Sequence, residues 1–354
     1  MTYKTGASTT IALRVVNSAF GTAIAVGAAG DKLVLDSFDF NLNNQVLTTN
    51  MIGAGLEMLD GTDAGAVAPT GTTSGPARYN DATKAGVALF FAGNSVSTPF
   101  PTTGCQSFLY DANINQRFAT IAWEECVGSI VEVACAFPVK YMVEAAPYTY
   151  LKESLDWVGN NLTFSGATSG PVNTSANLAT ATVADSQKVI CKDTSTWQMN
   201  GQAGAALGAG DYFTCKKVTI EYKRLKEMSL EMKGSAGLSA PIPTGEPPFE
   251  CDVTVEFSNE ADFLWKLNFV NGTEYKAALT VTGPVISGSG TYLQQHVFPR
   301  LKVVEEPDMA LAKAGVNPFT VKFKALVATA NPTGMIHTYP YMRLQSTKTT
   351  AFLT

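Results

Sequence analysis

The chain has 354 residues, a formal net charge of −5 and only 16% charged residues. This length accommodates one large β domain or two domains of ordinary size, and the low charge suits a β-rich protein whose polar surface is partly covered by neighbours, since globular domains usually carry about 25% charged residues. The acidic balance disfavours a dedicated nucleic-acid-binding protein, which normally has a basic footprint.

Neither the apolar pattern nor the cysteines indicate a membrane, secreted or zinc-binding protein. No stretch approaches the roughly 18 uninterrupted apolar residues of a membrane helix. The N-terminus lacks the apolar run of a signal peptide, so we expect synthesis in the cytoplasm. The cysteines form no C-x-x-C pair and have no nearby histidine, so we expect reduced core residues rather than zinc ligands. They are Cys105, Cys126, Cys135, Cys191, Cys215 and Cys251.

The first elements are two strands followed by a long loop. Residues 8–16 form a plausible strand or arm, and residues 33–42 alternate as a strand. The apolar parity of this second strand changes by one residue at Asp36 and Ser37, which predicts a β-bulge. Residues 48–82 are rich in Gly, Ala, Thr and Pro, and we expect them to form a long loop, which at this length is usually functional or disordered.

Three further strands are predicted before a connector. They lie around residues 86–92, 117–123 and 130–141. Pro138 lies within the last of these and indicates an edge or a bulge, because proline cannot donate to a sheet. The uncharged, turn-rich residues 160–185 read as a boundary between two halves.

The second half has a specific order of elements from Lys216 to Gly283. A strand over residues 218–222 precedes a Gly/Ser/Pro-rich loop over 233–249, which is followed by a strand over 253–257, a short helix over 259–268 and a strand over 275–281.

The end of the chain is predicted to contain two strands and a helix. The strands cover residues 297–304 and 319–327, and the helix covers 305–315, where Pro307 suits the first turn. The tail over residues 331–354 has little periodicity and could lie as an arm on a neighbouring molecule.

Both halves place an alternating strand before a long Gly/Pro loop and a strand pair later. We therefore predict two tandem β-sandwich domains, residues 1–159 and 186–354, joined by a linker over 160–185. No residue-level identity between the halves supports this duplication, which is an argument from pattern alone.

The chain offers little chemistry. His296 and His337 have no partner nearby in sequence, and no P-loop, dinucleotide fingerprint or nucleophile elbow is present. Glu124 and Glu125 are adjacent on a strand, so their carboxylates point to opposite faces. We expect no catalytic residues, no metal ligands and no cofactor, and hence a protein that is not an enzyme.

A basic cluster and three tryptophans have simple explanations. The cluster is interleaved with Glu221, Glu227 and Glu231, which favours a solvated or intersubunit face over a phosphate-binding track. Its members are Lys216, Lys217, Lys223, Arg224 and Lys226. We expect Trp157, Trp197 and Trp265 to anchor the core rather than to stack on ligands.

The element order around KGSAGLSAPIPTGEPPFE resembles that of the tail tube proteins of long-tailed bacteriophages, as do TGASTTIALRVVNSAFGTAIAVGAAGDKLVLDSFDF and VKFKAL. The resemblance implies β-sandwich domains with short flanking helices, whose inward strands pair edge to edge into a ring-closed β-barrel. Rings stack into a tube that conducts the genome, and long loops, here residues 48–82 and 233–249, reach the adjacent ring.

The resemblance also implies a location and partners. The chain would be a virion tail protein made in the host cytoplasm, contacting copies of itself, the tape measure protein and the tail terminator and tip proteins. Double-stranded DNA would pass without sequence-specific binding, and no membrane would be bound. Because a duplicated chain supplies two tube domains, we expect three chains per ring, with six as the alternative.

Three other classes compete with this interpretation. A capsid or baseplate subunit would share the structural role. A carbohydrate-binding β-sandwich would expose Trp157, Trp197 and Trp265 as a sugar platform. An outer-membrane porin would also be acidic and β-rich, but we expect no signal peptide and the inter-strand segments are too irregular.

Overall fold

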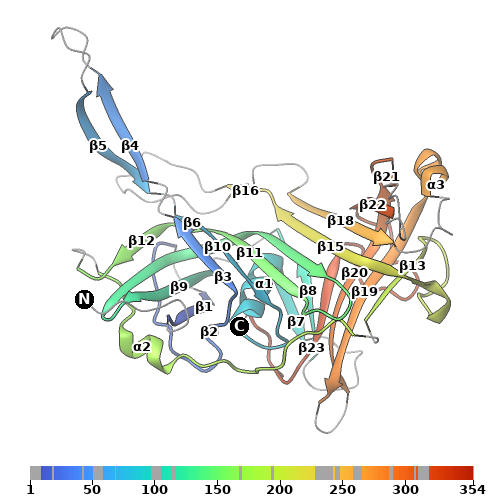
Figure 1. Cartoon of the computed structure of the whole chain (residues 1–354), viewed down its shortest axis with the longest axis horizontal. Coiled ribbons are helices and arrows are strands. Elements are labelled where there is room, and N and C mark those ends of the chain that lie inside the picture. Colours follow the sequence, from blue (N-terminus) through green and yellow to red (C-terminus); the bar gives the residue numbers. More distant parts are fainter. Residues whose placement is uncertain are drawn as a thin grey trace, which may run out of the picture.

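The computed structural model describes residues 9–17, 20–41, 44–50, 59–67, 69–96, 105–112, 117–166, 170–192, 195–227, 242–243, 248–257, 265–286, 290–306, 308–309 and 319–353. The protein is mainly β, with antiparallel strands joined into one large sheet and three α-helices within these residues (Figure 1).

The elements fall into two groups along the chain. The first group comprises β1 (Ile11–Asn17), β2 (Lys32–Leu33), β3 (Ser37–Asn41), β4 (Asn44–Asn50), β5 (Leu59–Val67), β6 (Thr70–Pro76), α1 (Ala82–Phe91), β7 (Ala92–Val96), β8 (Cys105–Tyr110), β9 (Arg117–Cys126), β10 (Ser129–Ala145), β11 (Lys152–Val158), β12 (Asn161–Phe164) and α2 (Ser175–Thr180). The second comprises β13 (Thr196–Gly201), β14 (Tyr212–Phe213), β15 (Cys215–Arg224), β16 (Lys226–Glu227), β17 (Ile242–Pro243), β18 (Phe249–Phe257), α3 (Trp265–Asn271), β19 (Glu274–Val285), β20 (Thr291–Val303), β21 (Asp308–Met309), β22 (Phe319–Ala325) and β23 (Tyr341–Gln345).

Ten strands form a continuous path of hydrogen-bonded neighbours, which we call the long sheet. Its order is β3–β6–β11–β10–β15–β18–β22–β20–β19–β13. The pairings among the described strands never return to their start, so the chain does not close a barrel by itself. The predicted ring-closed barrel therefore remains a prediction about an assembly.

The long strand β10 joins two layers. Its first part pairs with β9 and β12, and its last part pairs with β11 and β15. Register shifts interrupt it between Val133 and Ala136 and between Pro138 and Lys140, and Cys135 has a left-handed φ of 50°. The bulge predicted at Pro138 is confirmed. These bends let the first part of β10 pair with β9 and β12 while its last part pairs with β11 and β15.

Helix α1 lies inside the molecule, and the strand predicted over residues 86–92 was wrong there. Nine of its ten residues are buried, and Asp81 caps its N-terminus by accepting a hydrogen bond from the Lys84 amide at 3.2 Å. A helix that is apolar all round must be enclosed. A short apolar run does not distinguish such a helix from a buried strand, which explains the error.

Several other predictions need correction. The loop expected over residues 48–82 contains β5 and β6; β4 and β5 form a hairpin that projects from the body (Figure 1), and β6 lies inside the long sheet. The tail contains β23, which pairs with β20 and β8 of its own chain. Asp308–Met309 is a strand rather than part of a helix. Most of the predicted loop over 233–249 lies outside the described residues.

The sheet also crosses the predicted domain boundary. β10 pairs with β15, and β8 pairs with β23, so strands on both sides of residues 160–185 share one sheet. One hydrophobic core contains side chains from both groups, including Trp157 and Trp197. The connector packs back on the first group, where Leu178 contacts a small cluster with Ala12 and Ile130. Two separately folded sandwiches do not describe this arrangement.

Candidate functional site: the open strand edges

The two groups of strands repeat the same pairing scheme. Each of seven pairings in the first group has a counterpart in the second. They are β1–β2 and β13–β14, β1–β9 and β13–β19, β3–β6 and β15–β18, β6–β11 and β18–β22, β9–β10 and β19–β20, β10–β11 and β20–β22, and β10–β12 and β20–β23. α1 follows β6 as α3 follows β18.

The irregularities of the strands repeat as well. In β10 the register against β9 shifts between Val133 and Ala136, and in β20 the register against β19 shifts between Phe298 and Leu301. In both strands two residues oppose one. A second shift follows Pro138 in β10 and Val303 in β20. The shift after Pro138 adds one residue relative to β11, whereas the segment from Val303 to Asp308 adds two residues relative to β22. Beyond these shifts, equivalent positions are therefore assigned through their partners in β11 and β22.

A third irregularity lies at the start of β3 and β15. In β15 the shift falls between Cys215 and Lys217. In β3 the Asp36 amide donates to the Ser74 carbonyl, although Ser74 pairs with Ser37. The bulge predicted from the sequence at Asp36 and Ser37 is confirmed. Alignment at these shifts makes Ser37 of β3 equivalent to Lys217 of β15.

The two repeats meet where β10 pairs with β15, and we call this pairing the junction. Its register runs from Lys140 opposite Lys223 to Ala145 opposite Val218. The rings of Tyr141 and Tyr222 stack with centroids 5.6 Å apart and planes at 9°. The junction is therefore a regular, interior part of the long sheet.

Each repeat also carries one strand of a second such junction without the other strand. The counterpart of β15 is β3, and the counterpart of the second part of β10 is the end of β20 continued by β21. Among the strands that the structure describes, β3 pairs only with β6 and β21 only with β22. Two complementary strand edges are therefore open, one along β3 in the first repeat and one along β21 beside β22 in the second (Figure 1).

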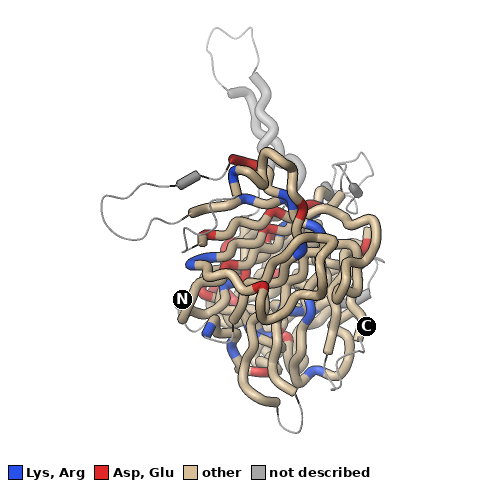
Figure 2. The backbone as a smooth tube through the Cα atoms, turned by 90° about the vertical axis from the view of Figure 1, so that its right-hand side faces the viewer, with Lys and Arg blue, Asp and Glu red and all other residues tan. Residues whose placement is uncertain are grey.

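Ion pairs neutralise the solvent-facing side of the junction. Lys140 lies 2.6 Å from Glu221, Lys217 pairs with Glu144, and Lys223 lies 3.4 Å from Glu221. Although burial opposes the change, the hydrogen bond and charge of Lys140 hold the pKa of Glu221 below its ordinary value. Figure 2 shows cationic and anionic residues interspersed along the backbone.

Three members of the basic cluster predicted from the sequence are engaged within the chain. Lys217 and Lys223 are paired as described, and Arg224 is 2% exposed. The Arg224 guanidinium donates to the Phe90 and Asp111 carbonyl oxygens, each at 2.5 Å. Burial lowers the pKa of Arg224 to about 10, so the group stays charged near neutral pH but faces the interior.

A buried polar network behind the junction was missed by the sequence analysis. It joins α1, β10, β11, β15 and β20, and we call it the junction network. Its members are Lys84, Tyr141, Glu153, Tyr222, Gln294 and His296. Lys84 is the residue that could have indicated this network from the sequence, because a lysine within an apolar helix requires a buried partner.

Glu153 is the centre of the junction network. Its Oε1 accepts hydrogen bonds from Lys84 Nζ at 2.5 Å, Tyr141 OH at 2.6 Å and Gln294 Nε2 at 2.8 Å. Gln294 Nε2 also lies 3.1 Å from His296 Nε2, which accepts as a neutral imidazole. All these side chains are buried, so the network ties the repeats together and has no access for a substrate.

The remaining residues singled out from the sequence are structural. Trp157, Trp197 and Trp265 are 1%, 2% and 3% exposed, which confirms core positions and leaves no sugar platform. Glu124 is buried while Glu125 is exposed, as adjacent strand positions require. His337 packs edge-on against another ring. Each of the six cysteines is a thiol rather than half of a disulfide.

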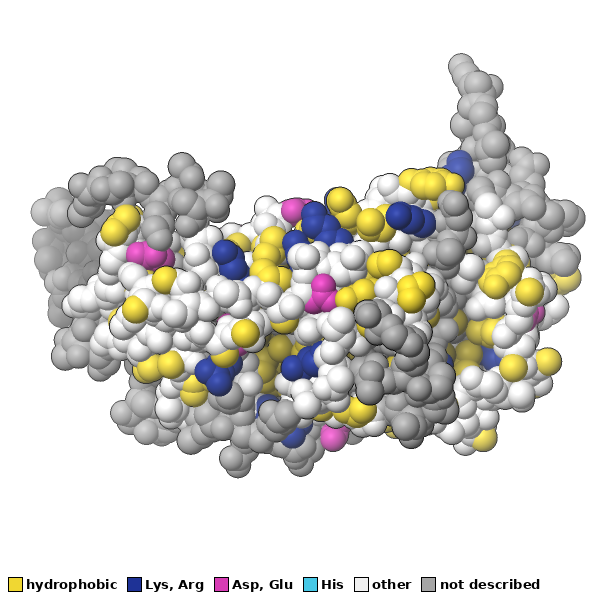
Figure 3. Space-filling model, turned by 90° about the horizontal axis from the view of Figure 1, so that it is seen from below, with side chains coloured by type: hydrophobic (Ala, Val, Ile, Leu, Met, Phe, Trp, Pro, Cys, Tyr) yellow, Lys and Arg dark blue, Asp and Glu magenta, His cyan; other side chains and the backbone are white. Residues whose placement is uncertain are grey.

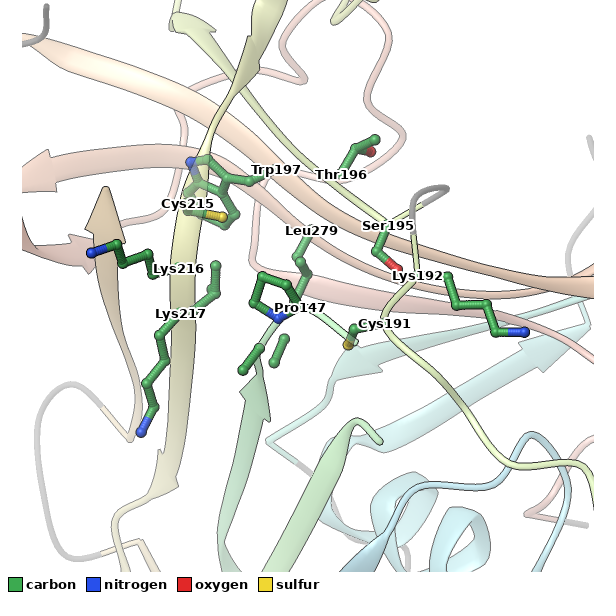
Figure 4. Close-up of a pocket in the computed structure, with 13 residues that line it drawn as sticks. Pro147, Cys191, Lys192, Ser195, Thr196, Trp197, Cys215, Lys216, Lys217 and Leu279 are labelled. Atoms are coloured by element: carbon green, nitrogen blue, oxygen red, sulfur yellow. The ribbon is translucent and has the colours of Figure 1, made fainter. Parts of the chain in front are cut away.

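A small cleft of about 90 Å³ lies beside the start of β15 (Figure 4). Pro147, Trp197 and Leu279 line it together with Cys191 and Cys215. Burial raises the pKa of each thiol to about 11, so neither is a nucleophilic thiolate near neutral pH. No group of three metal-ligating side chains gathers in the part of the chain that the structure describes.

The face of the molecule in Figure 3 carries small apolar groups separated by polar and charged side chains. No helix among the described residues is long and apolar enough to cross a membrane. Comparison of the sequence with protein-family models and with curated proteins found no match. The open edges are therefore the feature of the described structure that most directly indicates a function.

Proposed function

We propose that this protein is a self-assembling structural subunit of a viral tail tube. Copies join in a ring when β3 of one copy pairs with β21, which follows β20, of the next. The observation that carries the proposal is the junction, because the chain already contains this strand pairing between its own repeats. Open sheet edges favour association, and a head-to-tail contact generates a closed ring when its rotation closes.

The proposal specifies a register. In the junction Met142 lies opposite Glu221. Met142 is equivalent to Asp308, and Glu221 is equivalent to Asn41, when the repeats are aligned at their bulges and through their partners in β11 and β22. Asp308 of one copy therefore lies opposite Asn41 of the next.

The same arrangement accounts for passage of DNA. The solvent-facing side of the long sheet, with its paired lysines and carboxylates, forms the wall of the channel. Because Lys324 also pairs with Glu250 and Asp252, both at 3.1 Å, few cations on this face are free to bind phosphates. DNA then passes without specific binding, in a virion tail that also contains the tape measure, terminator and tip proteins.

Stacking of rings is assigned to the projecting hairpins. The β4–β5 hairpin lies between β3 and β6, and β16–β17 lies at the equivalent place between β15 and β18. The two hairpins follow the C-terminal ends of β3 and β15. Because these equivalent strands run in the same direction in the long sheet, both hairpins leave it on the same side. A capsid or baseplate subunit would share the lateral pairing and differ in this axial contact.

A disulfide cross-link tests the register. The variant Asn41→Cys/Asp308→Cys is expected to form covalent multimers under mild oxidation, seen on non-reducing gels, because paired strand residues meet the distance that a disulfide requires. In the control Ser37→Cys/Asp308→Cys the first cysteine is displaced by about 13 Å along the strand. Absence of multimers, or equal yields in both variants, contradicts the pairing. Electron microscopy of the unmodified protein is a separate test, and the proposal requires that it show rings or tubes.

A further inference from the structure

Helix α3 exposes aliphatic side chains at one open end of the molecule. Leu267 is 53% exposed and Val270 is 79% exposed, and Val304 nearby in sequence after β20 is 47% exposed. The other side of the helix is anchored by Trp265, which is buried and stacks on Phe257 at 5.4 Å. Figure 1 shows α3 beside β21, next to one of the two open edges.

Its counterpart α1 shows how such a helix is buried when the other repeat covers it. The second repeat covers α1: Arg224 donates to the Phe90 carbonyl, and the Phe91 ring lies 5.3 Å from the Tyr222 ring. Lys84 of α1 donates to Gln294 of β20 at 2.9 Å. Both Arg224 and Tyr222 belong to β15, the strand that forms the junction.

We propose that the exposed face of α3, formed by Leu267 and Val270, is an interaction surface for the first repeat of a second copy of this chain. The inference rests on the proposed ring. β3 is the counterpart of β15, so the neighbour that supplies β3 at the open edge also supplies the cover for α3.

The other end of the chain offers a matching apolar surface. Phe38 and Phe40 of β3 are only half-buried, although their rings lie 4.9 Å and 5.7 Å from Trp123. They occupy the positions equivalent to Val218 and Ile220, which are fully buried in the chain. Completion of burial at both ends is the free-energy gain that selects a second copy as the partner.

The test compares a double variant with a matched control. Leu267→Ser/Val270→Ser removes the α3 face, and Val127→Ser/Val172→Ser removes two exposed valines in the β9–β10 turn and in the segment between β12 and α2. Sedimentation velocity over a concentration series is expected to show at least a tenfold weaker association for the α3 variant and unchanged association for the control. Exposed positions rarely affect folding, and circular dichroism verifies this.

Hydrogen exchange supplies a second readout. Amides of α3 are expected to exchange more slowly in assembled rings than in dilute monomer. Rings that form with unprotected α3 and tolerate the α3 variant overturn the inference while leaving the proposed function intact. A chain that stays monomeric at every concentration overturns both.

Discussion

At the scale of residues, the junction network determines how the two repeats are held. Lys84 comes from α1, Glu153 from β11 and Gln294 from β20, so three distant segments share one hydrogen-bonded cluster. Removing one partner from such a cluster leaves another buried and unsatisfied, which costs more than the net gain of the bond. The network therefore favours one relative placement of the repeats.

His296 makes stability depend on pH in a specified direction. Burial, with the charge of Lys84 adding to it, lowers the pKa of His296 to about 3 from an ordinary value of 6.5. Between these values the unfolded chain binds a proton that the folded chain does not, so stability decreases as pH falls below 6.5. The full effect at low pH is about 5 kcal/mol.

We therefore expect urea unfolding of dilute monomer to show a free energy of unfolding that declines from pH 6.5 toward pH 4. The variant His296→Gln should lose this part of the decline. Asp81 acts in the opposite direction, since burial chiefly raises its pKa to about 6, which makes stability fall as pH rises from about 4 to 6. Comparison of the two proteins cancels this contribution, and equal slopes would contradict the assignment to His296.

At the scale of elements, α1 shows tertiary packing overriding local preference. Gly86 lies inside the helix, where alanine is usually better by about 1 kcal/mol. A Cβ at Gly86 would lie 2.9 Å from Leu155 Cδ1 and 3.0 Å from Trp157 Cη2. Both neighbours are buried and cannot move aside freely.

The variant Gly86→Ala is accordingly expected to destabilise the protein by about 1–3 kcal/mol, because overpacking outweighs helix propensity. Gly210→Ala is the control, since a Cβ there meets nothing within 4 Å. Its expected change is within about 0.5 kcal/mol. Thermal or urea unfolding measures the stability of both variants. A stabilised Gly86→Ala protein would show that the side chains around α1 move to accommodate the added methyl group.

The paired bulges are the second element-scale result. A bulge shifts one strand by a residue, and every side chain beyond it changes face. Three such shifts, together with the strand partners in β11 and β22, fix the alignment of the two repeats, which the amino-acid identities alone do not. This alignment permits a specific register to be stated for the open edges.

At the scale of the whole molecule, the presence of two repeats in one chain determines how many chains the proposed ring needs. In the proposed ring each copy contributes both halves of a junction, so n copies give a ring of 2n repeats. Three copies then supply six repeats, and the number of chains is half that of a single-repeat subunit in the same barrel.

We expect the smallest closed assembly to contain three chains. With a chain mass of 37.5 kDa, native mass spectrometry should detect a species of about 112 kDa. A species of about 225 kDa without the smaller one would indicate six chains, and the first repeat would then lie outside the ring. The Asn41→Cys/Asp308→Cys variant traps the smallest ring for this measurement.

The sequence by itself determined the β class and the position of several of the longer strands. Alternation of apolar and polar residues is a local property, so β10, β15, β18 and β19 were found with small errors at their ends. The bulges at Asp36 and Pro138 were visible for the same reason. Core positions for Trp157, Trp197 and Trp265 followed from their size.

Only the tertiary structure decided which strands pair, and therefore where the open strand edges lie. The β10–β15 junction joins segments about 80 residues apart, and its existence depends on backbone hydrogen bonds that no local pattern encodes. The enclosure of α1, the cluster around Glu153 and the open edges of β3 and β21 all follow from that pairing. A hydrophobic pattern specifies which face of an element is buried, whereas the partner that buries it is selected by the packing of the whole chain.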